Sequence, residues 1–409
     1  ASLYGDEYPF YKPTDLDAGF DVCFSEDTVS EKGYKNGRIL PVYSVLVTCI
    51  GATIGKTGYI RNSGICNQQI NAILPNTFIL PEYTYFCMCS EFEQQQIWTN
   101  SSATTLPILN KSKFDSLFFP VPPKAQQTRT VERIKELLHF VEIIQQEKRT
   151  LQETIKLTKS KILDLAIRGK LVPQDPNDEP ASVLLERIRT EKEELIKQGK
   201  IKRDEKESII FRGDDNSYYL RTGEVEESLE NWRFDDLPET WEICCLCELC
   251  DYGDCISVNT EDIAEDAWIL DLEDIEKDTG TVLKKVAKAQ RNSVSTKHKF
   301  HSGQVLYSKL RPYLNKVVLS DADGYCTSEI LPLEFKNCVL PEYARYYLMS
   351  GTFIAYANHC SYGVKMPRLG TTDGKKAIFS LPPLSEQKRI VETIDFFFMQ
   401  LNKISEALA

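Results

Sequence analysis

The sequence Leu80-Pro81-Glu82-Tyr83 occurs a second time as Leu340-Pro341-Glu342-Tyr343, at an offset of 260 positions. Further pairs of segments share this offset: Val45-Leu46 and Val305-Leu306, Pro107 with Leu109 and Pro367 with Leu369, Pro122-Pro123 and Pro382-Pro383, Val131-Glu132 and Val391-Glu392. Chance matches between common residues would not keep one register from the first of these pairs to the last. The pattern therefore indicates an internal duplication of one structural unit.

Each copy combines the signals of strands and of helices. Val45–Ile50 and Val317–Leu319 are short apolar, β-branched runs bounded by turn-forming residues, which predicts strands of a twisted sheet. Tyr343–Leu348 predicts a helix. A Pro-Pro pair then ends each globular part and opens a further helix, where proline is tolerated because the first N–H groups of a helix need no partner within it.

The helix after the first Pro-Pro pair is predicted to be long. Apolar residues repeat at a 3–4 spacing through 124–168, which is typical of a coiled-coil seam. At about 1.5 Å per residue, such a helix reaches roughly 65 Å. One heptad position holds Ile134, Val141, Ile155 and Ile162, interrupted by Lys148, and the other holds Leu137, Ile144, Leu151 and Leu165, interrupted by Thr158.

The second copy begins a similar helix. A helix cannot bury an apolar stripe alone, so we expect the two helices to pack on each other. The alternative is that each stripe lies against its own globular unit. The expected fold class is α+β, with two repeated globular α/β units separated by long antiparallel coiled-coil helices. The seam residues of the second helix are Ile390, Ile394, Phe397, Leu401, Ile404 and Leu408.

These patterns predict five segments. A globular unit covers 1–122, and the long helix covers 123–170. The connector, 171–236, begins with the helix-breaking stretch Val172–Pro176 and continues as a charged helix with Ser182 as its expected N-cap. From Lys202 to Glu230 the connector is charge-rich, and we expect it to be mobile. The second globular unit covers 237–383, and the second helix covers 384–409.

The composition restricts the classes of function. The chain carries 49 basic and 60 acidic side chains, which argues against nucleic-acid binding over the whole surface and leaves room for a local basic groove. Its 13 cysteines are odd in number and irregular in spacing, as expected of free thiols in a reduced, cytoplasmic protein. We recognise no leader peptide and no apolar stretch long enough for a membrane span, so no membrane partner is expected.

Three motifs resemble catalytic or metal sites without meeting their requirements. Gly51 and Gly55 are separated by three residues, where a phosphate-binding Walker loop has four. Cys244, Cys247 and Cys250 have the spacing of zinc ligands but lack a fourth ligand and a distant second pair. The four histidines show no paired spacing. We therefore expect neither a catalytic residue nor a metal in this chain.

Two motifs carry a resemblance to a known family. They are Ile167-Arg168-Gly169-Lys170-Leu171-Val172-Pro173, followed by Asp178-Glu179-Pro180-Ala181, and Leu381-Pro382-Pro383-Leu384-Ser385-Glu386-Gln387. With the order unit, helix, unit, helix, the chain resembles the DNA-specificity subunits of type I restriction–modification systems over essentially its whole length. Supporting segments are Phe10–Leu16, Gly51–Gly58 and Asn67–Asn71.

The resemblance implies a role and a set of partners. Such subunits carry two target-recognition domains for one DNA target. They assemble with two methyltransferase subunits, which bind S-adenosylmethionine and methylate adenine, and with restriction subunits, which hydrolyse ATP with magnesium. The specificity subunit itself holds no cofactor and catalyses nothing. The sequence agrees, because it contains no Asn-Pro-Pro-Tyr methyltransferase motif and no Phe-x-Gly-x-Gly cofactor loop.

The chain departs from this family pattern at its ends. The second unit runs from Leu237 to Trp268 before the segment that matches Tyr8–Leu16 of the first unit. We therefore expect the first unit to lack its opening strand. The second helix reaches Ala409 and is shorter than the first, so we expect it to be truncated.

Candidates for DNA contact follow from side-chain chemistry. Arg and Lys suit guanine, Asn and Gln suit adenine, and Lys, Ser and Thr suit phosphates. In the second unit, no acid interrupts the stretch from Val305 to Val318. The candidates are Lys12, Thr14, Lys56, Thr57, Asn67, Gln68 and Gln69 in the first unit, and Tyr307, Ser308, Lys309, Arg311, Asn315, Lys316, Ser328, Lys365 and Arg368 in the second.

Two units on one side of double-stranded B-DNA predict half-sites about 10 bp apart, with the long helix as a ruler. Two other classes of function are an enzyme with an unrecognised site and a coiled-coil interaction scaffold without DNA specificity. A DNA reader loses duplex affinity steeply as salt rises, whereas a scaffold binds no duplex at all.

Overall fold

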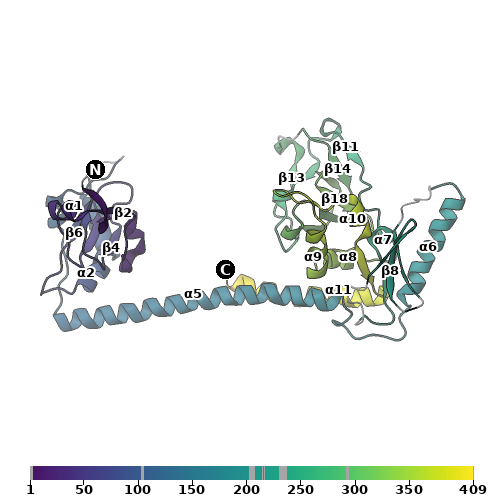
Figure 1. The fold of residues 1–409 in the computed structure, drawn as a ribbon, viewed down its shortest axis with the longest axis horizontal. Coiled ribbons are helices and arrows are strands. Elements are labelled where there is room, and N and C mark those ends of the chain that lie inside the picture. Colours follow the sequence, from purple (N-terminus) through teal and green to yellow (C-terminus); the bar gives the residue numbers. More distant parts are fainter. Residues whose placement is uncertain are drawn as a thin grey trace. The chain divides into compact units, whose positions relative to one another are not determined.

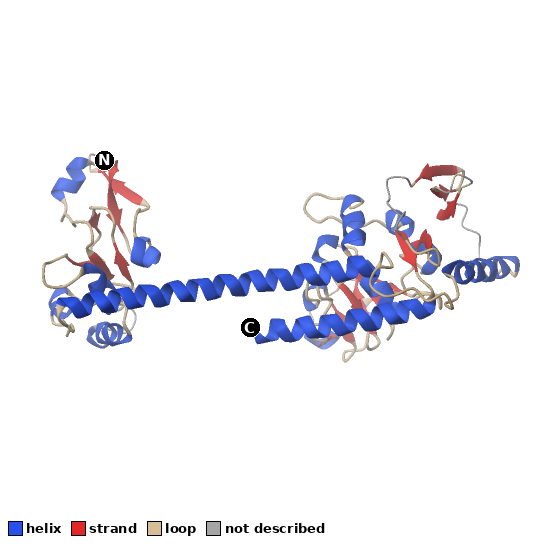
Figure 2. Ribbon diagram, turned by 90° about the horizontal axis from the view of Figure 1, so that it is seen from below, coloured by secondary structure: helices blue, strands red, loops and turns tan. Residues whose placement is uncertain are grey.

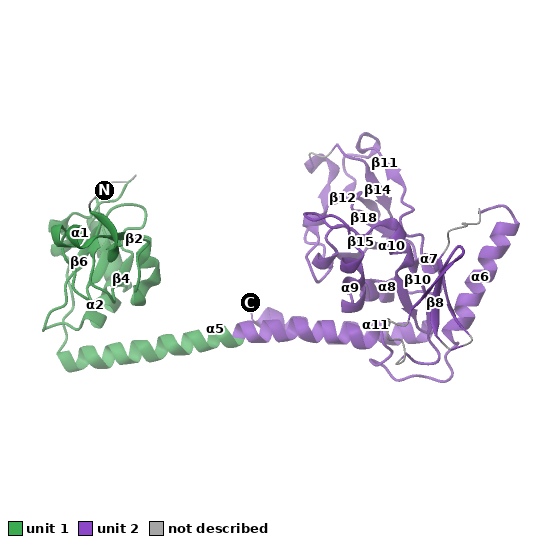
Figure 3. Cartoon of the chain, in the orientation of Figure 1, with its two compact units in different colours: residues 1–147 green, residues 148–409 purple. Residues whose placement is uncertain are grey.

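The computed structural model of the chain describes residues 3–102, 106–201, 208–213, 215, 217–229, 237–291 and 294–408. The chain divides into two compact units, residues 1–147 (unit 1) and 148–409 (unit 2) (Figure 3). Helix α5 (Lys124–Ala166) begins in unit 1 and ends in unit 2 (Figure 1). Parts of the segment expected to be mobile, residues 202–207, 214, 216 and 230, lie outside the described residues.

Unit 1 contains two small sheets. In one, β3 lies between β4 and β6, and both neighbours are antiparallel. In the other, β1 pairs antiparallel with β2 and parallel with β5. Strand β3 is buried on both faces, which explains its apolar run Val45-Leu46-Val47. The elements are β1 (Tyr4–Tyr11), η1 (Asp15–Asp21), β2 (Asp27–Val29), α1 (Glu31–Asn36), β3 (Val45–Thr48), β4 (Thr57–Tyr59), β5 (Ile65–Cys66), β6 (Ile70–Ile73), α2 (Pro81–Met88), α3 (Glu91–Asn100) and α4 (Lys111–Asp115).

Unit 2 contains the same two sheets with additions. Strand β15 lies between β16 and β18, and the parallel pair of β12 and β17 corresponds to β1 and β5. The second sheet has five strands in the order β11-β14-β17-β12-β13. These elements are β11 (Ser257–Val258), η2 (Thr260–Asp262), β12 (Trp268–Leu270), η3 (Leu272–Asp274), β13 (Val286–Ala287), η4 (Lys288–Gln290), β14 (Lys297–Phe300), β15 (Val305–Ser308), η5 (Pro312–Leu314), β16 (Val317–Leu319), β17 (Gly324–Thr327), β18 (Ile330–Leu333), α8 (Pro341–Leu348), α9 (Gly351–His359), α10 (Thr371–Lys376), β19 (Ile378–Leu381) and α11 (Leu384–Ala407).

The duplication is confirmed at the level of secondary structure. Strands β3, β4 and β6 and helix α2 begin 260 positions before β15, β16, β18 and α8, respectively. The expected α+β class, with two repeated units and long helices, is likewise confirmed.

Helix α11 lies antiparallel to the end of α5 (Figure 2). Lys159 Nζ of α5 donates to Asn402 Oδ1 of α11 at 2.6 Å. Ile162 of α5 and Ile394 of α11 belong to one buried cluster together with the core of unit 2, so this end of α5 packs on the helix and on the domain at once. Further toward the N-terminus of α5, the expected seam residues are exposed: Leu137, Val141, Ile144 and Leu151.

The connector holds more structure than its composition indicates. After α6 (Ala181–Lys197), the strands β7 (Ser208–Arg212), β8 (Tyr218–Thr222) and β9 (Val225–Ser228) form an antiparallel meander. Ile210 and Leu220 of this meander pack on Ile243 and Ile378. The charge-rich sequence did not predict these strands. On a sheet with one buried face, only every second side chain needs to be apolar, so the strands can carry many charged residues.

The units differ at one sheet edge. In unit 2, β10 (Glu242–Cys245), which precedes α7 (Leu246–Leu249), pairs antiparallel with β19. The corresponding residues of unit 1, Phe118–Val121, form no strand, and no described residue of unit 1 pairs with them in a sheet. Phe118 is accordingly 79% exposed, whereas Ile378 at the equivalent position of unit 2 is 8% exposed.

A buried glutamine attaches each long helix to its unit. In unit 1, Gln127 Oε1 accepts from the Leu80 N–H at 2.8 Å, and Gln127 Nε2 donates to the Pro122 carbonyl at 2.9 Å. In unit 2, Gln387 makes the equivalent bonds with Leu340 and Pro382, at 2.8 and 3.0 Å. A buried amide satisfied at both ends fixes one direction for the helix that carries it.

The core of unit 1 contains an ionisable group. Glu93 on α3 is fully buried, and this burial raises the pKa of its carboxyl to about 7. Gln96 Nε2 donates to Glu93 Oε2 at 3.2 Å, and no cation among the described residues pairs with the carboxylate. The equivalent position of unit 2 is Phe353, an apolar core residue.

The substitution Gln127→Leu is expected to lower the free energy of unfolding of the chain by roughly 2–4 kcal/mol, because the Leu80 N–H and the Pro122 carbonyl lose their partner in a buried place. Urea unfolding followed by circular dichroism measures the change. Gln126→Leu, on the exposed face of the same helical turn, is the matched control and should change stability by no more than about 0.5 kcal/mol. Equal losses in the two variants would contradict the assigned role.

Stability should also depend on pH through Glu93. Because its folded-state pKa of about 7 lies above the ordinary value of 4.5, the contribution of the protonated carboxyl is complete below about pH 4.5 and is lost as pH rises through 7. Relative to Glu93→Gln, the wild-type chain should therefore lose stability between pH 4.5 and 8. The control Glu91→Gln, exposed on the same helix, should follow the wild-type curve. Parallel curves for wild type and Glu93→Gln would refute the prediction.

Candidate nucleic-acid interface

Three loops meet beside the central strand of each unit, and we call the set the three-loop platform. In unit 1 it comprises 49–55 between β3 and β4, 67–69 between β5 and β6, and 102–109 after α3, of which 103–105 lie outside the described residues. In unit 2 it comprises 309–315, 327–329 and 362–369. The offset between the two platforms is again 260 positions.

Backbone hydrogen bonds hold the platform of unit 1 together. The Cys49 N–H donates to the Gln69 carbonyl at 2.7 Å, which joins the first loop to the second. The Gly51 N–H donates to the Pro107 carbonyl at 3.0 Å, and the Leu109 N–H donates to the Cys49 carbonyl at 2.8 Å, which join the first loop to the third. The three loops therefore form one rigid surface.

The platform of unit 2 has the same three bonds. The Lys309 N–H donates to the Glu329 carbonyl at 3.0 Å, the Arg311 N–H to the Pro367 carbonyl at 2.7 Å, and the Leu369 N–H to the Lys309 carbonyl at 3.0 Å. Because these bonds use backbone atoms only, side chains on the loops can change without loss of the scaffold.

The platform of unit 1 presents amides. Asn67 Nδ2 donates to Gln69 Oε1 at 3.0 Å, and the Gln69 N–H donates to Asn67 Oδ1 at 3.1 Å, while Gln68 is exposed between them. A Cβ atom on Gly51 would lie 3.9 Å from Gln69 Nε2, so this amide lies beside the first loop. Asn and Gln side chains can donate to and accept from the same base edge, as adenine requires.

The platform of unit 2 presents cations. Lys309, Arg311 and Lys365 lie on two of its joined loops, and none of them makes an ion pair with a carboxylate among the described residues. Ser328 is exposed on the remaining loop. In a chain with a net charge of −11, these cations provide a local positive surface. Lysine and arginine are side chains that suit phosphates and guanine.

Other candidates in unit 1 lie outside the three loops of the platform, near η1. Lys12 forms an ion pair with Asp27. Lys56 Nζ contacts Asp17 Oδ1 of η1 at 2.6 Å. Thr14 is exposed at the start of η1, and Thr57 is buried, with its hydroxyl bonded to the Gly55 carbonyl at 2.9 Å. The interface that we propose therefore does not include these four residues.

Several candidates in unit 2 are directed into the domain. Tyr307 and Ser308 lie in β15, which is buried on both faces, and each side chain is 3% exposed. Asn315 Nδ2 donates to the Met349 carbonyl at 3.3 Å from a buried position. Lys316 Nζ donates to the Leu272 carbonyl at 2.6 Å, and burial lowers its pKa. The side chains of these four residues are directed into the domain and are not part of the surface that we propose for DNA.

Arg368 lies on the platform but is already paired. Its guanidinium donates to both carboxylate oxygens of Glu329, with distances of 2.7 to 3.0 Å, and this hydrogen bonding raises its pKa. The pair joins the second and third loops of the platform. A structural role for Arg368 follows from this geometry.

Sequence reasoning missed the apolar tip of the third loop. The N–H groups and carbonyls of Tyr362 and Arg368 bond to each other at 3.0 and 3.1 Å, so the residues between them project as a closed loop. Val364 at the tip is fully exposed, and Met366 is 45% exposed. The signal in the sequence was the offset of 260 positions, which aligns this loop with residues 102–108 of unit 1. Ser102 and Ile108 close that loop by the same pair of bonds.

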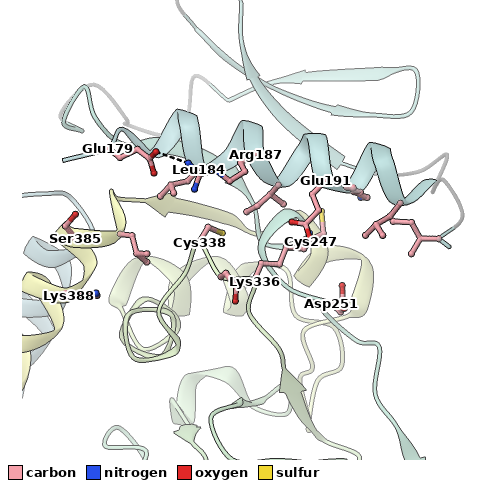
Figure 4. Close-up of a pocket in the computed structure, with 16 residues that line it drawn as sticks. Glu179, Leu184, Arg187, Glu191, Cys247, Asp251, Lys336, Cys338, Ser385 and Lys388 are labelled. Carbon is pink, nitrogen blue, oxygen red and sulfur yellow. Dashed lines mark hydrogen bonds and ion pairs between the residues drawn. The ribbon is translucent and has the colours of Figure 1, made fainter. Parts of the chain in front are cut away.

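A groove of about 830 Å³ lies elsewhere in unit 2, along α6 (Figure 4). Leu184 of α6 and Cys338 form part of its apolar wall. Both acidic and basic side chains line it. The acidic ones are Glu179, Glu191 and Asp251, and the basic ones are Arg187, Lys192, Lys336 and Lys388. Such a mixed rim does not fit the uniformly negative backbone of DNA.

The described residues contain neither a metal site nor a membrane span. Within those ranges, no three His, Cys, Asp or Glu side chains gather as metal ligands, and Cys244 and Cys250 are buried in the core. Among the helices described, none combines the length and apolarity needed to span a membrane.

Comparison with known proteins defines the class of the chain. A family model described as the type I restriction modification DNA specificity domain matches residues 4–153 and 238–408, one match for each copy of the duplication. The chain therefore belongs to the family of type I restriction–modification DNA specificity subunits.

Two relatives illustrate the similarity. The chain is 22% identical over 344 residues to the Type I restriction enzyme EcoDI specificity subunit of Escherichia coli, covering 83% of this chain and 67% of that protein. It is 30% identical over 266 residues to the EcoAI specificity subunit of the same organism, covering 62% of this chain and 42% of that protein.

Solved structures agree on the fold. The HsdS subunit from Thermoanaerobacter tengcongensis matches with a TM-score of 0.52 and 14% identity, over 100% of this chain and 90% of that one. A chain from a structure of a type I R-M system matches with a TM-score of 0.56 and 15% identity, over 91% of this chain and 78% of that one.

Proposed function

We propose that this chain reads a bipartite DNA target, with the three-loop platform of each unit reading one half. The observation that carries the proposal is that one backbone scaffold occurs twice with different side chains: amides at Asn67 and Gln69, and cations at Arg311 and Lys365. Amides suit adenine and guanidinium groups suit guanine, so the two units would read different sequences.

In this proposal the chain is a non-catalytic scaffold. Its partners are double-stranded DNA, two methyltransferase subunits that carry S-adenosylmethionine, and restriction subunits that use ATP and magnesium. We assign the methyltransferase contacts to the exposed faces of α5 and α11. Family membership supports the DNA-specificity role, and we infer these particular partners from the same family membership.

The rival function is an interaction scaffold without DNA specificity. The platform of unit 2 favours the DNA-reading function, because Lys309, Arg311 and Lys365 on its loops have no acidic partners among the described residues. An interaction scaffold without DNA specificity does not require such cations. Binding to duplex DNA across a salt series separates the two, since a reader that neutralises several phosphates loses affinity steeply with salt.

Methylation mapping tests the proposal directly. The chain is co-expressed with its methyltransferase partner, and modified adenines are located across the genome. We expect a motif of two specified halves separated by a fixed gap. A continuous motif, or no sequence preference with an active partner, would contradict the reading by two units.

The length of α5 should determine the gap. Inserting one heptad between Glu147 and Lys148, where the helix is exposed, adds about 10 Å to it and should lengthen the gap by about three base pairs. The same seven residues inserted after Gly199, beyond the end of α6, are the matched control and should leave the gap unchanged. An unchanged gap in the α5 variant would rule out a helical ruler.

A further inference from the structure

Two residues of the first platform loop of unit 2 have a backbone conformation that favours glycine. Arg311 has a φ of 50° and Asn315 a φ of 48°. The equivalent residues of unit 1 are Gly51 and Gly55, with φ of 108° and 87°. A side chain in the left-handed region is strained, and such residues persist where the side chain serves a purpose.

Asn315 has a structural purpose. Its side chain donates to the Met349 carbonyl at 3.3 Å inside the domain. In unit 1, Gln94 from α3 occupies the equivalent place, donating to the Met88 carbonyl at 2.7 Å and to the Gly55 carbonyl at 2.9 Å. Asparagine at position 315 therefore replaces a glutamine that unit 2 lacks.

No structural purpose of this kind accounts for Arg311. The bond from its backbone N–H to the Pro367 carbonyl is made equally by Gly51 to Pro107, so the fold does not require a side chain there. Its guanidinium has one long hydrogen bond, from Nη2 to the Lys365 carbonyl at 3.4 Å, and its buried Nε has no partner.

Three other arginines of unit 2 have carboxylate partners. Arg368 pairs with Glu329, Arg389 with Asp178 and Arg291 with Asp271. Arg311 pairs with no carboxylate among the described residues, although it is only partly exposed. The Arg311 guanidinium is half-buried, and its backbone holds it in place. Its unused N–H groups can therefore donate to an acceptor on a ligand.

The surroundings of Arg311 are suited to DNA. Lys309 lies two residues before Arg311, and Lys365 lies on the third loop. Arg311 donates to the carbonyls of Lys365 and Pro367 on that loop. The tip of that loop projects, with Val364 fully exposed, so an extended ligand can approach this side of the domain. Two flanking lysines can bind phosphates while the planar fork of the arginine reaches a base.

We infer that Arg311 reads a guanine of the half-site recognised by unit 2, donating to its O6 and N7 atoms in the major groove. Arginine is the side chain that matches these two acceptors with two parallel N–H groups. The inference rests on the proposed DNA-reading function and adds to it the base and the residue. Gly51 leaves unit 1 without such a donor at the same position, which makes the two half-sites different by construction.

The test compares Arg311→Gly with wild type in the complex with the methyltransferase partner. Glycine suits the left-handed backbone, so the variant should melt at the wild-type temperature or above it. In methylation mapping it should keep the half-site of unit 1 and lose the guanine requirement at one position of the other half. Discrimination at that position should fall roughly ten- to hundredfold.

Matched variants isolate the side chain. Arg311→Lys should retain part of the preference, because lysine also donates to guanine. Lys299→Ala removes an exposed positive charge of unit 2 on β14, outside the three platform loops, and should leave the motif unchanged. In a duplex with 7-deazaguanine at the critical position, which lacks N7, wild type should lose affinity and Arg311→Gly should not.

Three outcomes would overturn the inference. If wild type yields a bipartite motif and Arg311→Gly yields the same one, another residue reads the base and the DNA-reading function stands. If Arg311→Gly melts earlier and weakens all positions of its half-site alike, Arg311 is structural. If wild type yields no bipartite motif, the proposed function fails together with the inference.

Discussion

The structure of each unit depends on one buried amide. Gln127 and Gln387 each bond to the backbone just before a helix of the globular unit and to the backbone that leads into a long helix. Inside a protein these groups have no water to replace a lost partner, so only one arrangement of helix and domain satisfies them all. The same bonds, 260 positions apart, explain why the Pro-Pro segment of both copies is followed by a glutamine in the first helical turn.

On this frame, the backbone and the side chains of the platform serve separate purposes. Three backbone hydrogen bonds join the loops in both units with distances that agree within a few tenths of an ångström. The side chains are therefore free to differ, as Asn67 and Gln69 of unit 1 differ from Thr327 and Glu329 of unit 2, and Gly51 differs from Arg311. In the function that we propose, backbone bonding allows one fold to present amides complementary to adenine in one copy and cations complementary to guanine in the other.

The copies also differ in what surrounds the shared frame. In unit 2, β10 covers the edge of β19, and the meander of β7, β8 and β9 packs against that pair. In unit 1, the equivalent edge at Phe118 is exposed. The core differs as well, because Glu93 of unit 1 replaces Phe353 of unit 2. The three-loop platforms are alike in spite of these changes, since their hydrogen bonds involve none of these residues.

The sequence by itself determined the duplication and the long helices, because a constant offset and a heptad period are one-dimensional patterns. The class of protein followed from the resemblance of its motifs to a known family. Only the tertiary structure decided which polar side chains face outward. Tyr307 and Ser308 appeared to belong to a cationic cluster, yet they lie in a strand buried on both faces. Arg368 meets Glu329, 39 positions away, and Lys56 meets Asp17, so their charges are neutralised. Pairings between distant residues arise from folding, and a local pattern contains no record of them.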